Sequence, residues 1–255
     1  MQKEHLPTTA EQVIAKYHST LRREQTLDPN AEVFIFKTFA RTVEGWLPQD
    51  KGAPILEIGC GEGTFQRYLQ SKGYRNLYAF DLSSENVHIC HQRGLRHVCR
   101  HDALQVFDYP GPEQGWEMIV CIDLLEHLPK SELCRFITAV RHRLRPSGSV
   151  IFQTPNMASV VGLYHRYNDL THEVGFTEKS VCDLLIASGF PPESIEVRPA
   201  WSAATWQGRL REMYLTALHR LIYLADGQAT PKIPTRNLLV RATPLTEETS
   251  GEDRL

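Results

Sequence analysis

The sequence predicts an α/β fold in which helices cover a mostly parallel β-sheet, and three observations carry this prediction. Short apolar segments alternate with amphipathic segments of about 10–15 residues, which is typical of parallel strands joined by right-handed crossovers. A glycine-rich turn follows the first apolar segment, and acidic residues end the next two. Apolar residues make up 42% of the 255 residues, which is enough for a buried core.

The expected elements follow one another through most of the chain. Strands are expected at residues 55–58, 76–81, 97–100, 117–122, 149–154, 194–198 and 236–243. Helices are expected at residues 64–71, 84–93, 130–144, 178–188 and 210–225. Residues 156–175 read as a long loop or a short helix, and loops of that length are often functional.

The two ends of the chain differ from this alternating part. Residues 8–25 predict a polar amphipathic helix, and residues 30–47 a more apolar one. We therefore expect a helical cap over residues 1–48, a main domain over residues 49–245, and a disordered acidic tail over residues 246–255.

Composition excludes several classes of protein. The formal net charge of −2 gives no global positive field to hold nucleic acid. No apolar run suggests a signal peptide or reaches the ~18 residues of a membrane span. The absence of any C-x-x-C pair predicts reduced thiols in a cytoplasmic protein. The cysteines are Cys60, Cys90, Cys99, Cys121, Cys134 and Cys182.

The first strand runs into Glu57-x-Gly59-x-Gly61-x-Gly63. A strand, a glycine turn and a helix point several backbone N–H groups into one crevice, where a nucleotide-like ligand can approach closely. The dinucleotide fingerprint would need a third glycine at position 64, which is threonine. The spacing therefore argues against a nicotinamide cofactor.

Two further strand ends carry groups suited to an adenosine ligand. Asp81 ends the second strand, where a carboxylate can accept both ribose hydroxyls. Asp102 and Ala103 follow the third strand, where a carboxylate and a small residue fit beside an adenine amino group. Either acid alone could also cap a helix or a turn.

These segments resemble the successive motifs of class I S-adenosylmethionine-dependent methyltransferases. The resemblance lies in residues 55–63, 79–83, 101–103, 119–128 and 144–156. It is closest to ubiquinone-biosynthesis O-methyltransferases and to bacterial sugar or polysaccharide methyltransferases, and it spans roughly residues 50–200. It implies a Rossmann-like three-layer sandwich of seven strands, the last of them antiparallel and beside the fifth.

The resemblance also implies roles for individual residues toward S-adenosylmethionine. Glu57 would orient the loop, and the backbone of Cys121 would meet the methionine amino group. The residues expected to contact the cofactor are Glu57, Gly59, Cys60, Gly61, Gly63, Asp81, Leu82, Asp102, Ala103 and Cys121. Ser147 departs from the family, which often has glycine there.

Two histidines are candidates for the acceptor side. A hydroxyl acceptor loses a proton as it attacks, and histidine is the base suited to neutral pH. His127 follows the fourth strand, and His172 follows the fifth with Asp169 nearby to orient it or bind a hydroxyl. The string Asp-x-Thr-His-x-x-x-Phe-Thr resembles a segment of many sugar-type methyltransferases and favours His172. Both histidines could instead have purely structural roles.

Metal binding and surface contacts remain open alternatives. Asp123, Glu126 and His127 would share one face of a helical turn and could hold a divalent ion, or form a solvated capping face. The amphipathic helix 210–225 could rest on a membrane near a lipid-linked acceptor, or cover a sheet or a dimer interface. Lys37 or Arg41 could touch the cofactor carboxylate or lie on the surface.

Three classes of function follow from this sequence. The first is O-methylation of a sugar, glycan or related hydroxyl by a monomer or homodimer. The second is small-molecule N- or C-methylation, and the third is a non-catalytic partner with the same fold. Methylation of DNA-base amines is excluded, because the segment Asp123-Leu-Leu-Glu126-His127 lacks the Pro-Pro-aromatic motif of that class.

Overall fold

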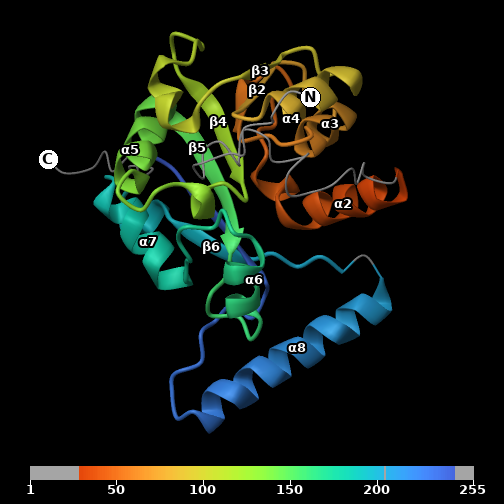
Figure 1. Cartoon of the computed structure of the whole chain (residues 1–255), viewed down its shortest axis with the longest axis vertical. Coiled ribbons are helices and arrows are strands. Elements are labelled where there is room, and N and C mark those ends of the chain that lie inside the picture. The colour runs from red at the N-terminus through yellow and green to blue at the C-terminus, as the bar shows by residue number, and fades with distance from the viewer. Residues whose placement is uncertain (1–28, 204, 245–255) are drawn as a thin grey trace, which may run out of the picture.

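The computed structural model describes residues 29–203 and 205–244. Their centre is a seven-stranded sheet in the order β3-β2-β1-β4-β5-β7-β6 (Figure 1). The strands are β1 (Ile55–Ile58), β2 (Leu77–Asp81), β3 (Val98–Arg100), β4 (Trp116–Ile122), β5 (Leu144–Pro155), β6 (Glu196–Pro199) and β7 (Asn237–Ala242). The alternating pattern thus predicted every strand of the sheet.

Strand direction confirms the predicted topology. β1 pairs in parallel with both β2 and β4. The strands β2 and β3 are added on one side of β1, and β4 and β5 on its other side, so the strand order reverses at β1. β7 is antiparallel to β5, with Val150 opposite Ala242, and also to β6. The carboxyl ends of β1 and β4 therefore meet at the switch point, where ligands bind in open α/β sheets.

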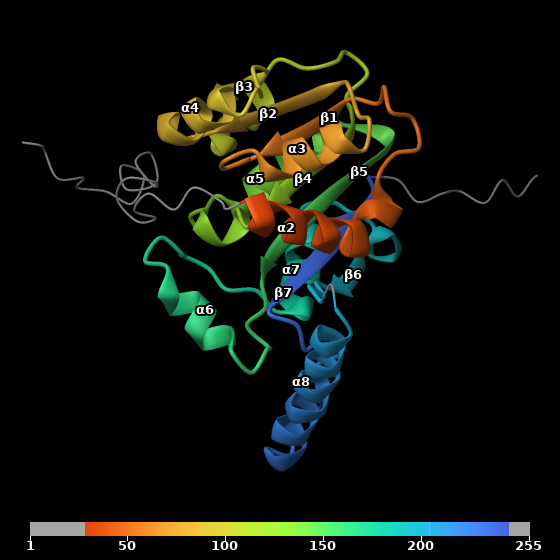
Figure 2. The same cartoon turned by 90° about the vertical axis from the view of Figure 1, so that its right-hand side faces the viewer.

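Helices cover both faces of the sheet (Figures 1 and 2). The helices are α2 (Pro29–Thr42), α3 (Thr64–Ser71), α4 (Ser84–Gln92), α5 (Leu133–Arg143), α6 (Gly162–Asn168), α7 (Glu178–Ala187) and α8 (Trp206–Ala225). α8 begins earlier than predicted because the Thr205 hydroxyl accepts the Gly208 N–H as an N-cap. The loop after β5 contains the short helix α6.

The buried side chains form one layer on each face of the sheet. Trp116 and Phe152 pack with Phe136 of α5 on one face. On the other face α2 joins α3, where the Phe39 and Phe65 rings meet edge to face at 5.0 Å. This confirms the predicted three-layer sandwich.

Some predictions fall beyond these elements. The expected helix 8–25 and the tail 246–255 lie outside the described residues. Among the described residues, no helix is long and apolar enough to cross a membrane.

Candidate functional site

The glycine loop after β1 is fastened to β2 by its backbone. The N–H groups of Gly59 and Cys60 both donate to the carbonyl of Phe80, at 2.9 and 3.1 Å. Gly59 and Gly61 have φ values of 70° and 53°, which side chains other than glycine's rarely adopt. A Cβ at Gly61 would meet nothing within 4 Å, so the loop backbone faces open space there.

Asp81 locks this loop to the start of α4. Its Oδ2 accepts the Gly61 N–H at 2.8 Å, and its Oδ1 accepts from the Ser83 N–H at 2.8 Å and from Asn86 Nδ2 at 3.1 Å. Burial raises the pKa of this carboxyl, and the three donors oppose that rise. A carboxylate has about four acceptor sites, so one remains for a ligand hydroxyl.

Glu57 is buried beneath the loop. Its Oε2 accepts from Gln66 Nε2 at 2.9 Å, and the Gln66 amide oxygen in turn contacts His97 Nε2 at 2.9 Å. Burial raises the pKa of Glu57 to about 8. The carboxyl is therefore mainly protonated at neutral pH in this structure, and it supports the loop from below.

A cavity of about 1000 Å³ opens at the switch point, between the glycine loop and the loop after β5. It is large enough for a cofactor with an acceptor beside it. The predicted site residues that line it are Glu57, Gly59, Cys60, Gly61, Asp81, His127, Asp169 and His172.

Five predicted cofactor residues lie outside this lining: Gly63, Leu82, Asp102, Ala103 and Cys121. Gly63 has φ 74°, and its Cβ position points at Leu95 and Cys90 instead of the cavity. Asp102 caps the turn after β3, where its Oδ1 accepts the Leu104 N–H at 2.9 Å. Cys121 is fully buried within β4.

His127 is connected to Asp169 through a threonine. Thr171 Oγ1 donates to Asp169 Oδ1 at 2.6 Å and contacts His127 Nδ1 at 2.8 Å. A hydroxyl has one proton, so Nδ1 of His127 donates to Thr171, which leaves the ring's lone pair on Nε2. Burial and the neighbouring His172 lower the pKa of His127 to about 4, so the ring is neutral at pH 7.

His172 lies against His127, with ring centroids 4.7 Å apart. Its Nδ1 contacts the carbonyl of His165 at 2.9 Å. A carbonyl only accepts, so this nitrogen carries the proton and the lone pair of the neutral ring is on Nε2. The loop that carries His172 is attached to the turn after β4, because the N–H groups of Glu173 and Val174 donate to the Glu126 carbonyl at 2.7 and 3.2 Å.

Glu126 completes a cluster with these two histidines. Its Oε2 accepts from Thr154 at 3.1 Å, whereas its buried Oε1 has no hydrogen-bond partner among the described residues. Burial raises the pKa of this carboxyl well above its usual range. One ligand atom from each of Glu126, His127 and His172 lies within 4.8 Å of the others.

The predicted grouping of Asp123 with Glu126 and His127 is wrong. Asp123 adopts φ 51° after β4, and a short 3₁₀ turn over Leu125–His127 follows instead of an α-helical turn. Its Oδ1 accepts from Gln153 Nε2 at 3.0 Å, and Asp123 is not in the group of ligand atoms that lie within 4.8 Å of one another. His172 takes its place in the group of possible metal ligands among the described residues.

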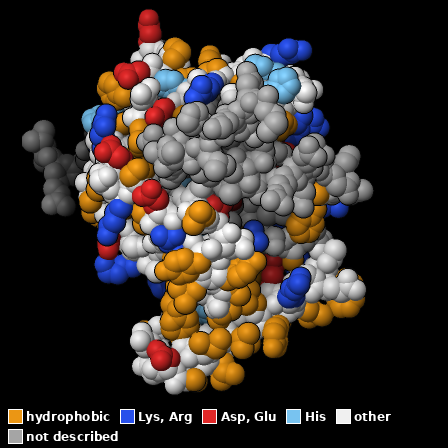
Figure 3. All heavy atoms as spheres, in the orientation of Figure 1, with side chains coloured by type: hydrophobic (Ala, Val, Ile, Leu, Met, Phe, Trp, Pro, Cys, Tyr) orange, Lys and Arg blue, Asp and Glu red, His pale blue; other side chains and the backbone are white. Residues whose placement is uncertain are grey.

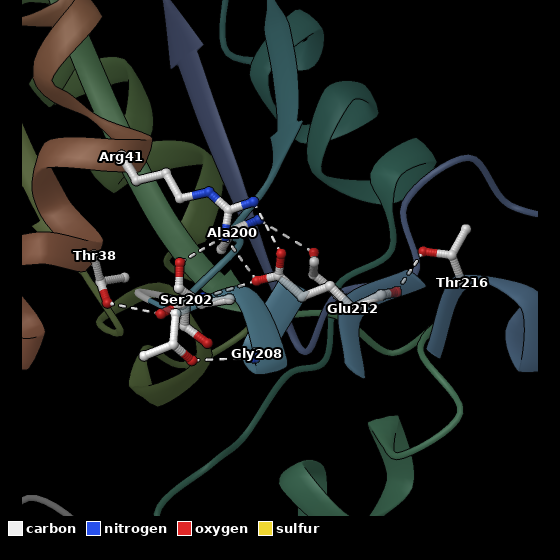
Figure 4. A network of polar contacts seen from close by, with 10 residues as sticks. Thr38, Arg41, Ala200, Ser202, Gly208, Glu212 and Thr216 are labelled. Carbon is white, nitrogen blue, oxygen red and sulfur yellow. Dashed lines mark hydrogen bonds and ion pairs between the residues drawn. The ribbon is translucent and has the colours of Figure 1, made fainter. Parts of the chain in front are cut away.

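Arg41 and Lys37 do not line the cavity. Arg41 forms a bidentate ion pair with Glu212 of α8, with both Nη–Oε distances 2.9 Å (Figure 4). Its Nη1 also donates to the Ala203 carbonyl at 3.0 Å. This network links α8 to α2. Lys37 is exposed.

Sequence reasoning missed part of the lining. Residues from α2, from the segment before α8, and from the start of β7 with the residue before it border the cavity: Thr38, Ala200, Ser202, Arg236 and Asn237. Tyr164 and His165 of α6 do so as well. No motif marks these positions, because long-range packing brings them to the switch point.

Comparison with known proteins agrees with this architecture. The family model described as "Methyltransferase domain" matches residues 31–195, more than half of the chain. A ubiquinone biosynthesis O-methyltransferase of Xylella fastidiosa is 30% identical over 120 residues, which cover 44% of this chain and 48% of that protein. The chain thus spans about half the length of the curated relatives that it matches.

Solved structures share the fold at low sequence identity. An S-adenosylmethionine-dependent methyltransferase from Archaeoglobus fulgidus gives a TM-score of 0.61 at 18% identity, covering 83% of this chain and 94% of that one. Phosphoethanolamine N-methyltransferase 2 from Haemonchus contortus, in complex with S-adenosyl-L-methionine, gives 0.56 at 15% identity, with 90% and 60% covered. With its sheet order, its glycine loop and the match over residues 31–195, this chain belongs to the methyltransferase domain family.

Proposed function

We propose that this protein is an S-adenosylmethionine-dependent O-methyltransferase acting on a hydroxyl of a sugar, a glycan or a related acceptor. One observation carries the proposal: the glycine loop and the Glu126–His127–His172 cluster border the same cavity. A donor held at the loop and an acceptor held at the cluster would therefore meet within one enclosure, which is the main requirement for this transfer.

The loop residues fit an adenosine-containing cofactor. The open side of Gly61 allows a ligand to approach the backbone, and the remaining acceptor site of Asp81 suits one ribose hydroxyl. Gly59 and Cys60 would border the methionine part. Gly63, which packs against Leu95, supports the loop from outside the cavity and would act on the ligand indirectly.

His172 is the general base in this proposal. The acceptor oxygen would attack the activated methyl carbon that bound S-adenosylmethionine supplies, in line with the C–S bond that breaks, and S-adenosylhomocysteine would leave. The Nε2 lone pair of His172 would take the proton of that hydroxyl, because Nδ1 is already committed to the His165 carbonyl. The neutral ring of His127 beside it, held by Thr171 and Asp169, would position the acceptor.

Replacing His172 tests this assignment. The change His172→Ala should lower turnover by ~10²–10⁴ while leaving the affinity for S-adenosylhomocysteine nearly intact. A fixed-time assay with labelled methyl donor measures turnover, and calorimetry measures the affinity for S-adenosylhomocysteine. His142→Ala, at an exposed position on α5, is the control. Unchanged turnover in His172→Ala would remove His172 as the base.

A divalent cation is the second candidate for the same cluster. The unpartnered buried oxygen of Glu126 and the Nε2 lone pairs of His127 and His172 form a donor set of one carboxylate and two imidazoles, which suits Zn²⁺ or Fe²⁺ better than Mg²⁺. Such an ion would polarise the acceptor oxygen. Calorimetric titration with Zn²⁺ should show one site that Glu126→Gln abolishes, and full activity after exhaustive chelation would contradict this candidate.

Two alternatives compete with the proposed O-methylation: methylation of a small-molecule amine or carbon, and a non-catalytic role. A small-molecule amine or carbon acceptor needs no proton-removing histidine, and one structural relative is named as an N-methyltransferase. A pH–rate profile without a titrating base would favour that reading. Calorimetry showing no binding of S-adenosylmethionine would favour a non-catalytic partner. Mass spectrometry of extract fractions incubated with labelled donor would identify the acceptor directly.

We also propose the predicted division of the chain and its cytoplasmic location. The contribution of Thr38 and Phe39 of α2 to the cavity lining supports a helical cap that precedes the main domain. A cap of this kind would limit the access of water to the bound cofactor.

A further inference from the structure

α8 presents an apolar face to solvent. Trp206, Leu210, Met213, Tyr214, Ala217, Leu221 and Leu224 are all exposed. They recur at spacings of three and four residues, so they lie on one side of the helix. Figures 1 and 2 show α8 at the end of the molecule, standing away from the sheet. A surface helix of a globular protein normally turns such a face toward the core.

The opposite face of α8 is the one that is attached to the protein. Glu212 pairs with Arg41, and the buried His219 contacts the Pro231 carbonyl through Nε2 at 3.1 Å. Tyr223 donates its hydroxyl to the Ala158 carbonyl at 2.9 Å, just before α6. These contacts fix the rotation of α8, so the outward direction of the apolar face is a property of the fold.

The charges bordering this face have one sign. Arg209, Arg211 and Arg220 are exposed on α8, and the helical repeat places them along the two edges of the apolar face. Glu212 is the only acidic residue between Trp206 and Ala225, and Arg41 already neutralises it on the attached face. The outer surface of α8 is therefore apolar and aromatic with basic edges.

α6 continues the same surface. Leu163, Tyr164, Tyr167 and Leu170 of this helix and the loop after it are strongly exposed. Figure 3 shows hydrophobic side chains gathered over the part of the molecule where α6 and α8 lie. Tyr164 also lines the cavity, so the mouth of the cavity opens beside this surface. We call these residues of α6 and α8 together the α6–α8 surface.

We propose that the α6–α8 surface binds the face of an anionic lipid bilayer, with α8 lying in the plane of the interface. Exposed Leu, Trp and Tyr side chains enter the headgroup boundary, and basic residues at the edges pair with anionic lipid. A second copy of the chain is disfavoured, because antiparallel pairing of two α8 helices would bring Arg209 near Arg220 with no acid between them. The acceptor would then be an amphiphile held in the membrane, and this consequence rests on the proposed function.

Vesicle co-sedimentation of the full chain tests the binding alone, without any activity readout. We expect binding to vesicles of phosphatidylcholine with phosphatidylglycerol, and much weaker binding to phosphatidylcholine alone. Neutralising Arg209, Arg211 and Arg220 with Gln should lower partitioning on the order of 10²-fold, since each basic residue contributes about fivefold.

A matched pair of variants tests the apolar face. Leu221→Glu should lower partitioning by at least about tenfold. Phe107→Glu is the control, because Phe107 is exposed to the same extent, 61%, and belongs to neither α6 nor α8. Equal binding of the two variants, or no binding by the full chain, would overturn the proposal. Sedimentation velocity adds one further outcome: a dimer that Leu221→Glu dissociates, without vesicle binding, would assign the surface to a second copy.

Discussion

Replacing Gly63 with alanine should destabilise the protein more than the same change at Gly61. Both glycines have positive φ, at 74° and 53°, where a Cβ costs about 1–2 kcal/mol. At Gly63 the new Cβ would also lie 2.2 Å from Leu95 Cδ1 and 3.0 Å from Cys90 Sγ. At Gly61 it would meet nothing within 4 Å.

The surroundings of Gly63 decide the size of the effect. Leu95 and Cys90 are fully buried in a cluster with Ala79 and Val98, so a shift of Leu95 would disturb the packing of other core side chains. Overpacking of a filled core costs about 1–3 kcal/mol. The change Gly63→Ala should therefore lower the free energy of unfolding by ~2–5 kcal/mol, against ~1–2 kcal/mol for Gly61→Ala.

Urea unfolding followed by circular dichroism measures both free energies. Calorimetry with S-adenosylhomocysteine, at a temperature where both variants are folded, separates stability from binding. Gly61→Ala should weaken binding more than Gly63→Ala does, because only Gly61 borders the cavity. If the two variants lost equal stability, or if Gly63→Ala weakened binding more, our assignment of Gly63 to packing would be refuted.

Two further predictions concern the buried polar groups. The pKa of Glu57 in the folded protein, about 8, exceeds its ordinary value of 4.5. The contribution of Glu57 to the free energy of unfolding should therefore be fully present below pH 4.5 and fall between pH 4.5 and 8. The fall is at most about 1.4 kcal/mol per pH unit. Glu57→Gln should flatten that slope in urea midpoints measured at pH 6 and 8, and an unchanged slope would contradict the raised pKa. Thr171→Val removes the hydroxyl between Asp169 and His127, so we expect a loss of about 1–3 kcal/mol in stability and lower turnover, with unchanged cofactor affinity. Thr216→Val on α8 is the control for turnover, and equal turnover in both variants would show that the bridge is not used.

Local spacing predicted the strands and the glycine loop, and the resemblance to class I methyltransferases supplied the antiparallel place of the last strand beside the fifth. The seven strands were identified because apolar segments and turns alternate along the chain, and each strand end marks one edge of a parallel sheet. Glu57, Gly59, Gly61 and Asp81 line the cavity, and their positions follow from the nearest strand and helix, whereas their roles stay a prediction. Gly63 belongs to the same motif, yet its spatial neighbour Leu95 lies just after α4, more than 30 residues away in the sequence, so the spacing of the motif could not predict this contact.

The Glu126–His127–His172 cluster could not be predicted from sequence spacing. An α-helical turn would have put Asp123 on one face with Glu126 and His127, but Asp123 has a positive φ, a 3₁₀ turn follows it, and Asp123 is not in the group of possible ligands. His172 joins the cluster because the N–H groups of Glu173 and Val174 attach its loop to the Glu126 carbonyl. Such contacts depend on how two distant loops pack, which no local pattern records.

By itself the sequence determined a seven-stranded α/β methyltransferase fold, the glycine loop at its first strand, and the apolar periodicity of α8. Only the tertiary structure decided that His172 meets Glu126 and His127, and that the apolar face of α8 points outward. The physical reason is the sequence separation of the residues that interact. Hydrogen bonds and steric limits between neighbouring residues fix helices, strands and turns, whereas long-range contacts such as Arg41 with Glu212 fix which faces and which side chains meet.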